Sequence, residues 1–140
     1  MTSRNMQTYL KLTGQADFDE DLTSDKASNA MLTAATEDVE IHEPASLPQG
    51  GVHRGYDAWL QMHHTMRSLW DQKVETVSVW DIPEDDVIVL YSMMDWTAKA
   101  TGRRIRFPAV EVLRFRDGLI AKVEIFHQDA KAVLDTLEPL

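Results

Sequence analysis

The sequence contains no cysteine, which excludes a disulfide framework, a thiol nucleophile and a zinc site with thiolate ligands. Long hydrophobic runs are also missing: none approaches the ~20 apolar residues of a membrane-spanning helix, and the first residues lack the apolar stretch of a signal peptide. Positive charge is scarce, with 14 Lys and Arg against 23 Asp and Glu and a net charge of −9. Because an acidic surface repels phosphate backbones, we expect no binding to nucleic acid. Because long apolar runs and a signal peptide are missing, we expect a cytoplasmic protein that does not bind a membrane.

The residues that are present have a composition typical of globular proteins. Hydrophobic residues make up 44% and charged residues 26% of the 140 residues, so the chain can bury a core without disulfides or metals. No repeat, linker or low-complexity stretch divides it. We therefore expect one domain over residues 1–140.

Apolar residues recur at helical spacing in the first half of the chain and mostly alternate in the second half. This pattern predicts helices over residues 6–12, 24–36, 56–72 and 129–137, and strands over residues 39–42, 74–80, 87–96, 105–115 and 120–126. Thr101-Gly102 and Asp117-Gly118 are tight hairpin turns that leave no room for helices between the last strands. The expected fold is α+β, with helices on one face of a curved antiparallel sheet.

Three further segments are interpreted from their composition. Residues 43–51 contain two prolines and two glycines and are expected to form a loop. Residues 17–25 are strongly acidic and are expected to form a solvated connection. Residues 87–91 are a continuous apolar run, which is typical of a strand covered on both faces.

Glu111 is a carboxylate on an otherwise apolar strand face. Alternation along residues 105–115 places it between Ala109 and Leu113 on that face. Burying a carboxylate is costly unless it is paired, and burial raises its pKa. Glu111 is therefore a candidate general base or neutral hydrogen-bond donor in a pocket. The alternative is a structural carboxylate that an arginine or a hydroxyl satisfies across the sheet.

The last strand ends in a similar way. If it stays regular, His127 and Asp129 share one side, and a carboxylate at that spacing can orient an imidazole for acid–base chemistry. Both residues are candidate catalytic groups. Equally, both residues can simply end the strand, with Asp129 capping the helix that follows.

Two other histidines are weaker candidates. His42 leads into the loop of residues 43–51 and can reach the mouth of a pocket, so it stays a catalytic candidate. His63 lies on the apolar face of the helix at 56–72, where a histidine is more often a core residue than a catalyst. His63 and His64 point about 100° apart on a helix and cannot chelate one metal. No ligand spacing supports a metal site, and we predict none.

Large adaptable side chains are candidates for the lining of a ligand pocket. Methionine and aromatic side chains suit a flat hydrophobic ligand, although a plain core is their more common use. With His63, the candidate ligand-binding residues are Trp59, Met66, Tyr91, Met93 and Trp96.

Several segments together match the pattern of a known family. Residues 43–55 resemble its loop between the first strand and the third helix, and the match continues through Thr101-Gly102-Arg103, Val110-Glu111-Val112 and residues 116–120. An Asp just after the last strand completes it. From about Val39 to the C-terminus the chain resembles the SnoaL-like branch of the NTF2-like superfamily.

The resemblance implies a cone, in which a curved antiparallel sheet and about three helices enclose a cavity, usually within a homodimer. Proteins of this superfamily include polyketide cyclases, ketosteroid isomerases, dehydratases, epoxide hydrolases and binding domains that are not enzymes. The enzymes mostly use one carboxylate or histidine as acid or base, without a cofactor. The family position after the last strand often carries an acid, which is Asp129 here.

Three functions follow as hypotheses. In the first, which we favour, the protein is an enzyme of cyclase or isomerase type without a cofactor: Glu111 or Asp129 removes a proton next to a carbonyl, and His127 or His42 stabilises or shuttles it. In the second, the protein binds an apolar small molecule without turning it over. In the third, it is a dimerisation module in which the outer face of the sheet joins two copies.

Overall fold

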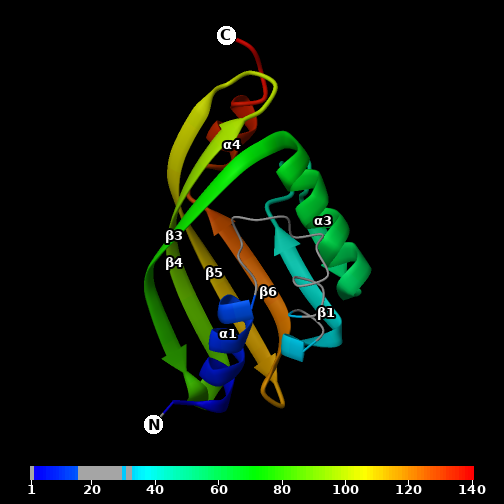
Figure 1. Cartoon of the computed structure of the whole chain (residues 1–140), viewed down its shortest axis with the longest axis vertical. Coiled ribbons are helices and arrows are strands. Elements are labelled where there is room, and N and C mark those ends of the chain that lie inside the picture. The colour runs from blue at the N-terminus through cyan, green and yellow to red at the C-terminus, as the bar shows by residue number, and fades with distance from the viewer. Residues whose placement is uncertain (1, 16–29, 31–32) are drawn as a thin grey trace.

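A computed structural model of the chain describes residues 2–15, 30 and 33–140 (Figure 1). In chain order the elements are α1 (Arg4–Gln15), β1 (Ala35–Glu43), β2 (Gly51–Arg54), α3 (Gly55–Leu69), β3 (Trp70–Ile82), the 3-10 helix η1 (Pro83–Asp85), β4 (Val87–Ala98), β5 (Arg104–Arg116), β6 (Leu119–His127) and α4 (Ala130–Asp135). None of these helices is long and apolar enough to cross a membrane.

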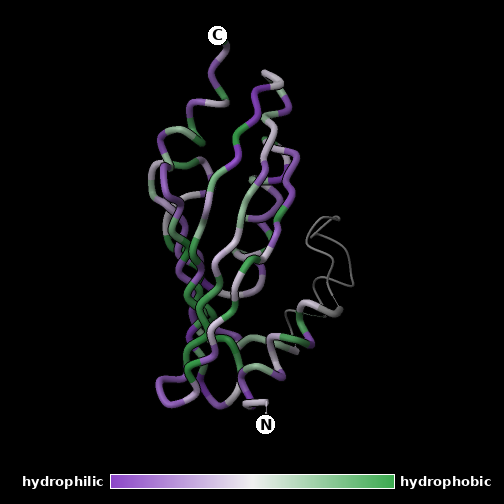
Figure 2. The backbone as a smooth tube through the Cα atoms, turned by 90° about the vertical axis from the view of Figure 1, so that its left-hand side faces the viewer, coloured by the Kyte–Doolittle hydropathy of each residue, from purple (hydrophilic) through white to green (hydrophobic). Residues whose placement is uncertain are grey.

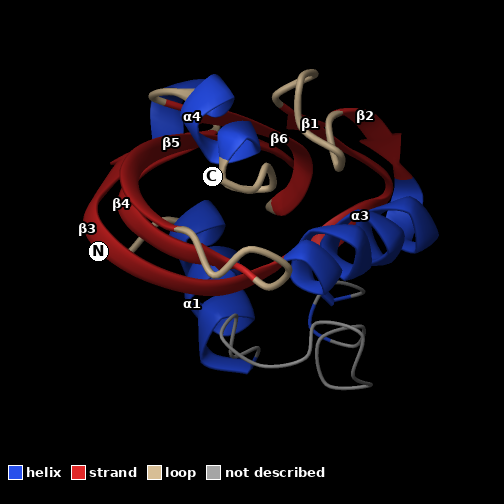
Figure 3. Cartoon of the chain, turned by 90° about the horizontal axis from the view of Figure 1, so that it is seen from above, coloured by secondary structure: helices blue, strands red, loops and turns tan. Residues whose placement is uncertain are grey.

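The six strands form one sheet in the order β2-β1-β6-β5-β4-β3. All neighbouring strands run antiparallel except β1 and β6, which are parallel. Seen from above, the sheet bends into an arc (Figure 3). Because β2 and β3 are edge strands, the arc does not close into a barrel.

The expected α+β class, with helices on one face of a curved sheet, is confirmed. The hairpins at Thr101-Gly102 and Asp117-Gly118 are also present, and both glycines have positive φ angles, 72° and 78°. The sheet differs from the expectation in two respects. It has a sixth strand, because Gly51 turns the chain back so that β2 pairs with the end of β1. It is mixed, because the long connection through α3 and three strands returns β6 parallel to β1.

Some boundaries also differ from the predictions. β1 begins at Ala35, inside the predicted helix of residues 24–36, and Trp70 opens β3 where the pattern continued the helix to residue 72. Most of the predicted helix at 24–36, and the acidic stretch at 17–25, lie outside the described residues.

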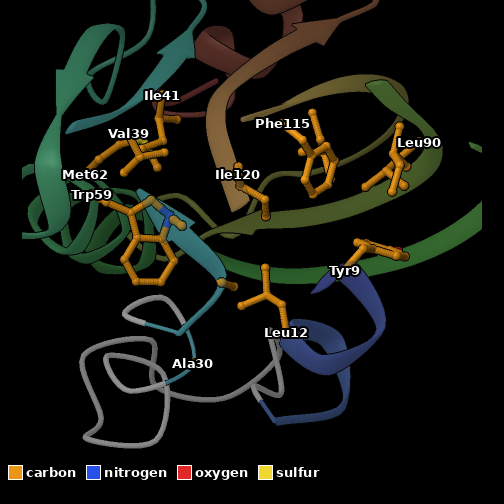
Figure 4. Close-up of a cluster of buried hydrophobic side chains, with 14 residues drawn as sticks. Tyr9, Leu12, Ala30, Val39, Ile41, Trp59, Met62, Leu90, Phe115 and Ile120 are labelled. Atoms are coloured by element: carbon orange, nitrogen blue, oxygen red, sulfur yellow. The ribbon is translucent and has the colours of Figure 1, made fainter. Parts of the chain in front are cut away.

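The inner face of the sheet carries two hydrophobic clusters. The first joins α1 and α3 to one half of the sheet (Figure 4); it includes Tyr9, Leu12, Val39, Ile41, Trp59, Met62, Ile88, Leu90, Leu113, Phe115 and Ile120. The second joins the end of α3 and α4 to the other half; it includes Leu47, Met66, Trp70, Met94, Trp96, Phe107, Ala109 and Val133. The hairpin turns at the ends of the sheet are hydrophilic, and the hydrophobic stretches lie along the strands between them (Figure 2).

The outer face of the sheet has no helix over it among the described elements. In β4 the buried residues alternate with half-buried ones, and Val89 and Tyr91 belong to the half-buried set. The prediction that residues 87–91 are covered on both faces is therefore wrong for the single chain. The outward apolar side chains have no layer to pack against.

Gly50 fixes the loop between β1 and β2. A Cβ atom there would lie 2.3 Å from the carbonyl oxygen of Pro44 and 2.7 Å from that of Leu47, so the backbone itself would have to move. We expect Gly50→Ala to lower the free energy of unfolding in urea by roughly 2 kcal/mol or more. Gly102→Ala is the matched control: its φ of +72° is unfavourable for alanine but no atom lies within 4 Å, so it should cost only about 1 kcal/mol. Equal losses in the two variants would contradict this account.

Candidate functional site

A polar residue interrupts the inner face of each of four strands where the first cluster meets the second. In β5, Glu111 separates Leu113 of the first cluster from Ala109 of the second. In β4 the residue at this border is the buried Ser92. β1 and β6 both end there, in Glu43 and His127. We call these four residues the polar belt: Glu43, Ser92, Glu111 and His127.

Strand register brings the belt together. Ser92 and His127 lie opposite the same residue, Ala109, on the two sides of β5. Glu111 lies opposite Ile125, two residues before His127 in β6. On the other side of β6, the parallel pairing of His42 with Glu124 sets Glu43 beside Ile125. The two glutamates therefore flank Ile125 from neighbouring strands, and His127 lies next to both in the adjacent row.

Glu43 and His127 form a buried pair. Their side chains are 2% and 1% exposed, and Glu43 Oε2 lies 4.0 Å from His127 Nε2, which is too far for a hydrogen bond. Burial, followed by the charge of Glu111, raises the pKa of Glu43 to about 8. Burial lowers the pKa of His127 to about 4. At neutral pH both groups are therefore mainly uncharged, so the pair is not an ion pair.

Burial also raises the pKa of Glu111, to about 7, so that near neutral pH this carboxyl is divided between its two protonation states. The side chain is nevertheless only half-buried, because part of the inner face around it stays accessible, including Val123 and Ile125 of β6. Tyr9 of α1 lies close enough for the charge of Glu111, after burial, to raise the pKa of its hydroxyl.

Three hydrogen bonds position α1 over this part of the sheet. Ser3 Oγ donates to Asp81 Oδ2 at 2.6 Å, Asn5 Nδ2 donates to Asp86 Oδ1 at 3.0 Å, and Thr8 Oγ1 donates to the Gly118 carbonyl at 2.5 Å. They tie the helix, and Ser3 just before it, to the end of β3 and to the turns that precede β4 and β6. As a result, Tyr9 is held on the inner face near Glu111.

Several buried polar atoms around the belt have no hydrogen-bond partner among the described residues. They are Glu43 Oε2 and His127 Nδ1 of the belt, and Trp96 Nε1 beside His127. The imidazole of His127 packs against Trp96 and Phe107, with ring centroids 5.5 and 4.9 Å away, and these two rings also contact each other. Buried polar groups are normally paired, so unsatisfied atoms gathered beside the belt are unusual.

Comparison with known proteins identifies the family. The model of the SnoaL-like domain matches residues 18–123. The chain belongs to the SnoaL-like family. No curated protein matches it significantly in sequence.

Solved structures with this SnoaL-like fold cover almost the whole chain at low identity. An NTF2-like protein from Burkholderia thailandensis superposes with a TM-score of 0.80 at 19% identity, over 99% of this chain and 100% of the other. TerC, co-crystallised with polyporic acid, gives 0.78 at 17% identity, over 97% and 99%. A candidate SnoaL-like polyketide cyclase from Jannaschia sp. CCS1 gives 0.76 at 16% identity, over 98% and 94%. At these identities the similarity concerns the fold.

Of the four catalytic candidates from the sequence, this SnoaL-like chain brings Glu111 and His127 together and not the other two. Asp129 is exposed, and its Oδ1 accepts a hydrogen bond from the Ala132 backbone N–H at 3.0 Å. It therefore caps α4, which was the alternative to a catalytic role. His42 lies on the outer face of β1, 4.0 Å from Glu40 and 32% exposed. The expectation that His42 reaches the site is wrong because it alternates with the inward-facing Ile41 and Glu43.

The ligand-binding candidates divide in the same way. Trp59 lies in the first cluster, and Met66 and Trp96 lie in the second, all on the inner side. His63 packs edge-on against Trp59 with ring centroids 4.7 Å apart. Burial, then the charges of Arg67 and His53, lowers the pKa of His63 to about 3, so it stays neutral.

Tyr91 and Met93 lie on the outer face of β4, because they alternate with the buried Ser92 and Met94. Their assignment to an inner pocket is therefore wrong. Glu43 and Ser92 are the belt residues that the sequence interpretation missed. Extending the alternation of Val39 and Ile41 by two residues would have found Glu43. Within the described residues, no group of three or more His, Asp or Glu side chains is placed to hold a metal ion.

The raised pKa of Glu43 has a consequence for stability. The pKa of Glu43 is 4.5 in the unfolded chain and about 8 in the folded protein. Between these two pH values the folded protein holds a proton that the unfolded chain releases. Stability is therefore full below pH 4.5 and is lost as the pH rises through 8. We expect the parent to lose on the order of 2 kcal/mol between pH 5 and pH 8.5 relative to Glu43→Gln, measured by urea unfolding. Parallel pH profiles for the two proteins would show that Glu43 ionises normally.

Proposed function

We propose that this protein is a cofactor-independent enzyme that transfers a proton next to a carbonyl group of an apolar small molecule, in a cyclisation or an isomerisation. The observation that supports this most is the pair of carboxyl groups on the inner face with pKa values near neutrality, about 7 for Glu111 and about 8 for Glu43. Enolisation needs a base and an acid that are available at the same pH. Similar structures that are candidate polyketide cyclases support the same class of reaction.

In the proposed reaction the carboxylate of Glu111 removes a proton from the carbon next to the substrate carbonyl. The electron pair of the C–H bond moves into the new carbon–carbon double bond, and the carbonyl oxygen gains negative charge. Glu43, which is protonated, stabilises that oxygen with a hydrogen bond. In an isomerisation, Glu111 returns the proton to a different carbon. In a cyclisation, the enolate carbon attacks a second carbonyl of the same molecule, and the proton goes to its oxygen.

His127 has a supporting part in this proposal. Its imidazole is neutral near pH 7, and its Nδ1 atom has no partner among the described residues. It therefore acts as a hydrogen-bonding group for the substrate and not as a cation. The rings of Trp96 and Phe107 beside it supply apolar surface for the rest of the substrate.

Deuterium exchange into model ketones such as cyclohexanone and 2-tetralone, followed by NMR, tests this function. Glu111→Gln should lower the enzyme-catalysed rate about a hundredfold or more, since general-base catalysis commonly contributes that much. The parent should show a bell-shaped pH profile, rising as Glu111 ionises near pH 7 and falling as Glu43 ionises near pH 8, with the two steps coupled. Glu43→Gln should remove the alkaline fall. Asp129→Asn, which changes only the cap of α4, should exchange at the parent rate.

Equal rates for the parent, Glu111→Gln and buffer would contradict catalysis. They would favour a second candidate function, the binding of an apolar ligand without turnover. The unpaired polar atoms around the belt support that candidate, and so does TerC, which was crystallised with a small molecule. Native mass spectrometry of the purified protein would then show a retained ligand.

We also propose that the protein acts as a cytoplasmic homodimer joined through the outer face of the sheet. Tyr91, Val110 and Phe126 form one apolar row across β4, β5 and β6, and Val112 and Met93 lie in the flanking rows. Phe126 is 55% exposed in the single chain. Ion pairs border the apolar rows, one between Arg114 and Glu124. A continuous apolar patch with a charged border is typical of a protein interface.

Sedimentation velocity at micromolar concentration tests the dimer. Phe126→Glu should produce a monomer, because it places a charge in the centre of the apolar rows. Leu10→Glu is the matched control, since Leu10 is 54% exposed but lies on α1, away from the outer face. A parent that sediments as a monomer, or two variants that behave alike, would contradict the proposed interface.

A further inference from the structure

We propose that the polar belt takes an organic cation, an apolar molecule that carries a single positive charge such as a protonated amine. The inference rests on the proposed function only in using the same site on the inner face. It names the class of ligand, and it holds whether or not that ligand is converted.

Among the described residues, the two carboxyl groups of the belt have no cation beside them. Glu43 and Glu111 lie on one face of the sheet, close enough for the charge of Glu111 to act on Glu43. In the described part of the chain, neither carboxyl forms an ion pair with a lysine or an arginine. Among the described residues, His127 is the only basic side chain with a nitrogen within 4.0 Å of a Glu43 carboxyl oxygen, and burial keeps this histidine neutral. A carboxylate formed here has no positive partner in the described structure.

The same holds for every described element that packs against the belt. On the inner side, α1 contributes the hydroxyl of Tyr9 and β4 contributes Ser92. α3 contributes His63, which burial and then the charges of Arg67 and His53 keep neutral, with a pKa of about 3; neither Arg67 nor His53 is among the groups that shift the pKa of Glu43 or Glu111. β6 contributes His127, which is also neutral. Among the described residues, an ionised Glu111 therefore has no positive charge beside it. A ligand with one positive charge neutralises it, and an anionic ligand adds a second buried negative charge.

Apolar side chains lie beside the carboxyls. Trp96 and Phe107 both pack against His127, with ring centroids 5.5 and 4.9 Å away, so two aromatic rings lie next to the belt. Aromatic faces attract cations, and the attraction increases where water is excluded. The partly accessible side chains of Val123 and Ile125 add aliphatic surface for an apolar body. The site thus combines uncompensated carboxyls with aromatic walls.

The affinity for a cation should depend on pH with a definite sign. A cation binds the ionised form of Glu111, so binding stabilises the carboxylate and releases a proton when the free site is protonated. Affinity should therefore increase with pH and level off once Glu111 is ionised. With a pKa of about 7 in the free protein, the increase between pH 6 and pH 8 is about tenfold.

Isothermal titration calorimetry with three matched probes tests the inference. The probes share one aromatic body: 1-naphthylmethylamine as the cation, 1-naphthalenemethanol as the neutral molecule and 1-naphthoate as the anion. At pH 8 the amine should bind about tenfold more tightly than the alcohol, and the naphthoate most weakly. The affinity for the amine should rise about tenfold from pH 6 to pH 8, with proton release visible as a difference between buffers of unlike ionisation enthalpy.

Three variants assign the effect. Glu111→Gln should lose the preference for the amine and its pH dependence, and should keep the affinity for the alcohol. Glu43→Gln should weaken binding of the amine more at pH 8 than at pH 6, because part of Glu43 is ionised in the parent only at the higher pH. Glu84→Gln removes one negative charge from the exposed turn η1 and should behave as the parent.

Equal binding of the three probes, tighter binding of naphthoate, or no binding of the amine at millimolar concentration would overturn the inference. If Glu111→Gln does not fold, the pH dependence and proton release of the parent decide alone. Ketone exchange measured on the same samples separates this inference from the proposed function. Amine preference without exchange supports the ligand class and removes catalysis, whereas exchange without amine preference removes the ligand class alone.

Discussion

The candidate site depends on two carboxyl groups that lie on the inner face of the sheet, largely withdrawn from water. In the described structure neither has a cation beside it. A buried carboxylate without a partner is expensive, so the protein holds its proton to higher pH instead. Glu43 and Glu111 accordingly have pKa values of about 8 and about 7. The same burial works in the opposite direction on His127 and keeps it neutral. One physical cause thus explains the acid, the base and the uncharged imidazole.

The position of these groups follows from the packing of the sheet. The inner face is filled from both ends, by the first cluster under α1 and α3 and by the second cluster under the end of α3 and α4. The polar belt lies at their border, where Glu111 and Ser92 interrupt otherwise apolar strand faces. The outer face is different: its apolar residues stay uncovered in the single chain. The proposed chemistry and the proposed contact with a second copy therefore lie on opposite faces of the sheet.

Much of the fold could be predicted from the sequence, because the determining signals are local. The glycine turns at 102 and 118 fix two hairpins, and alternation correctly placed Glu111 on the inner face. The strand β2 and the parallel pairing of β1 with β6 could not be predicted in this way, since both depend on contacts between segments far apart in the chain. For the site, the same alternation applies to β1 and β4. Using it there would have placed His42 and Tyr91 on the outer face and excluded both from the candidate site.

The meeting of Glu43, Glu111 and His127 could not be read from spacing alone, because it depends on register across three strands. The shifted pKa values depend in turn on that meeting. They are therefore the most direct test of the account. NMR titration of the side-chain carboxyl carbons of Glu43 and Glu111, assigned with the two Gln variants, should give midpoints near 8 and 7. Midpoints near 4.5 for both would show that the carboxyls are solvated or paired with a cation, and would contradict the account.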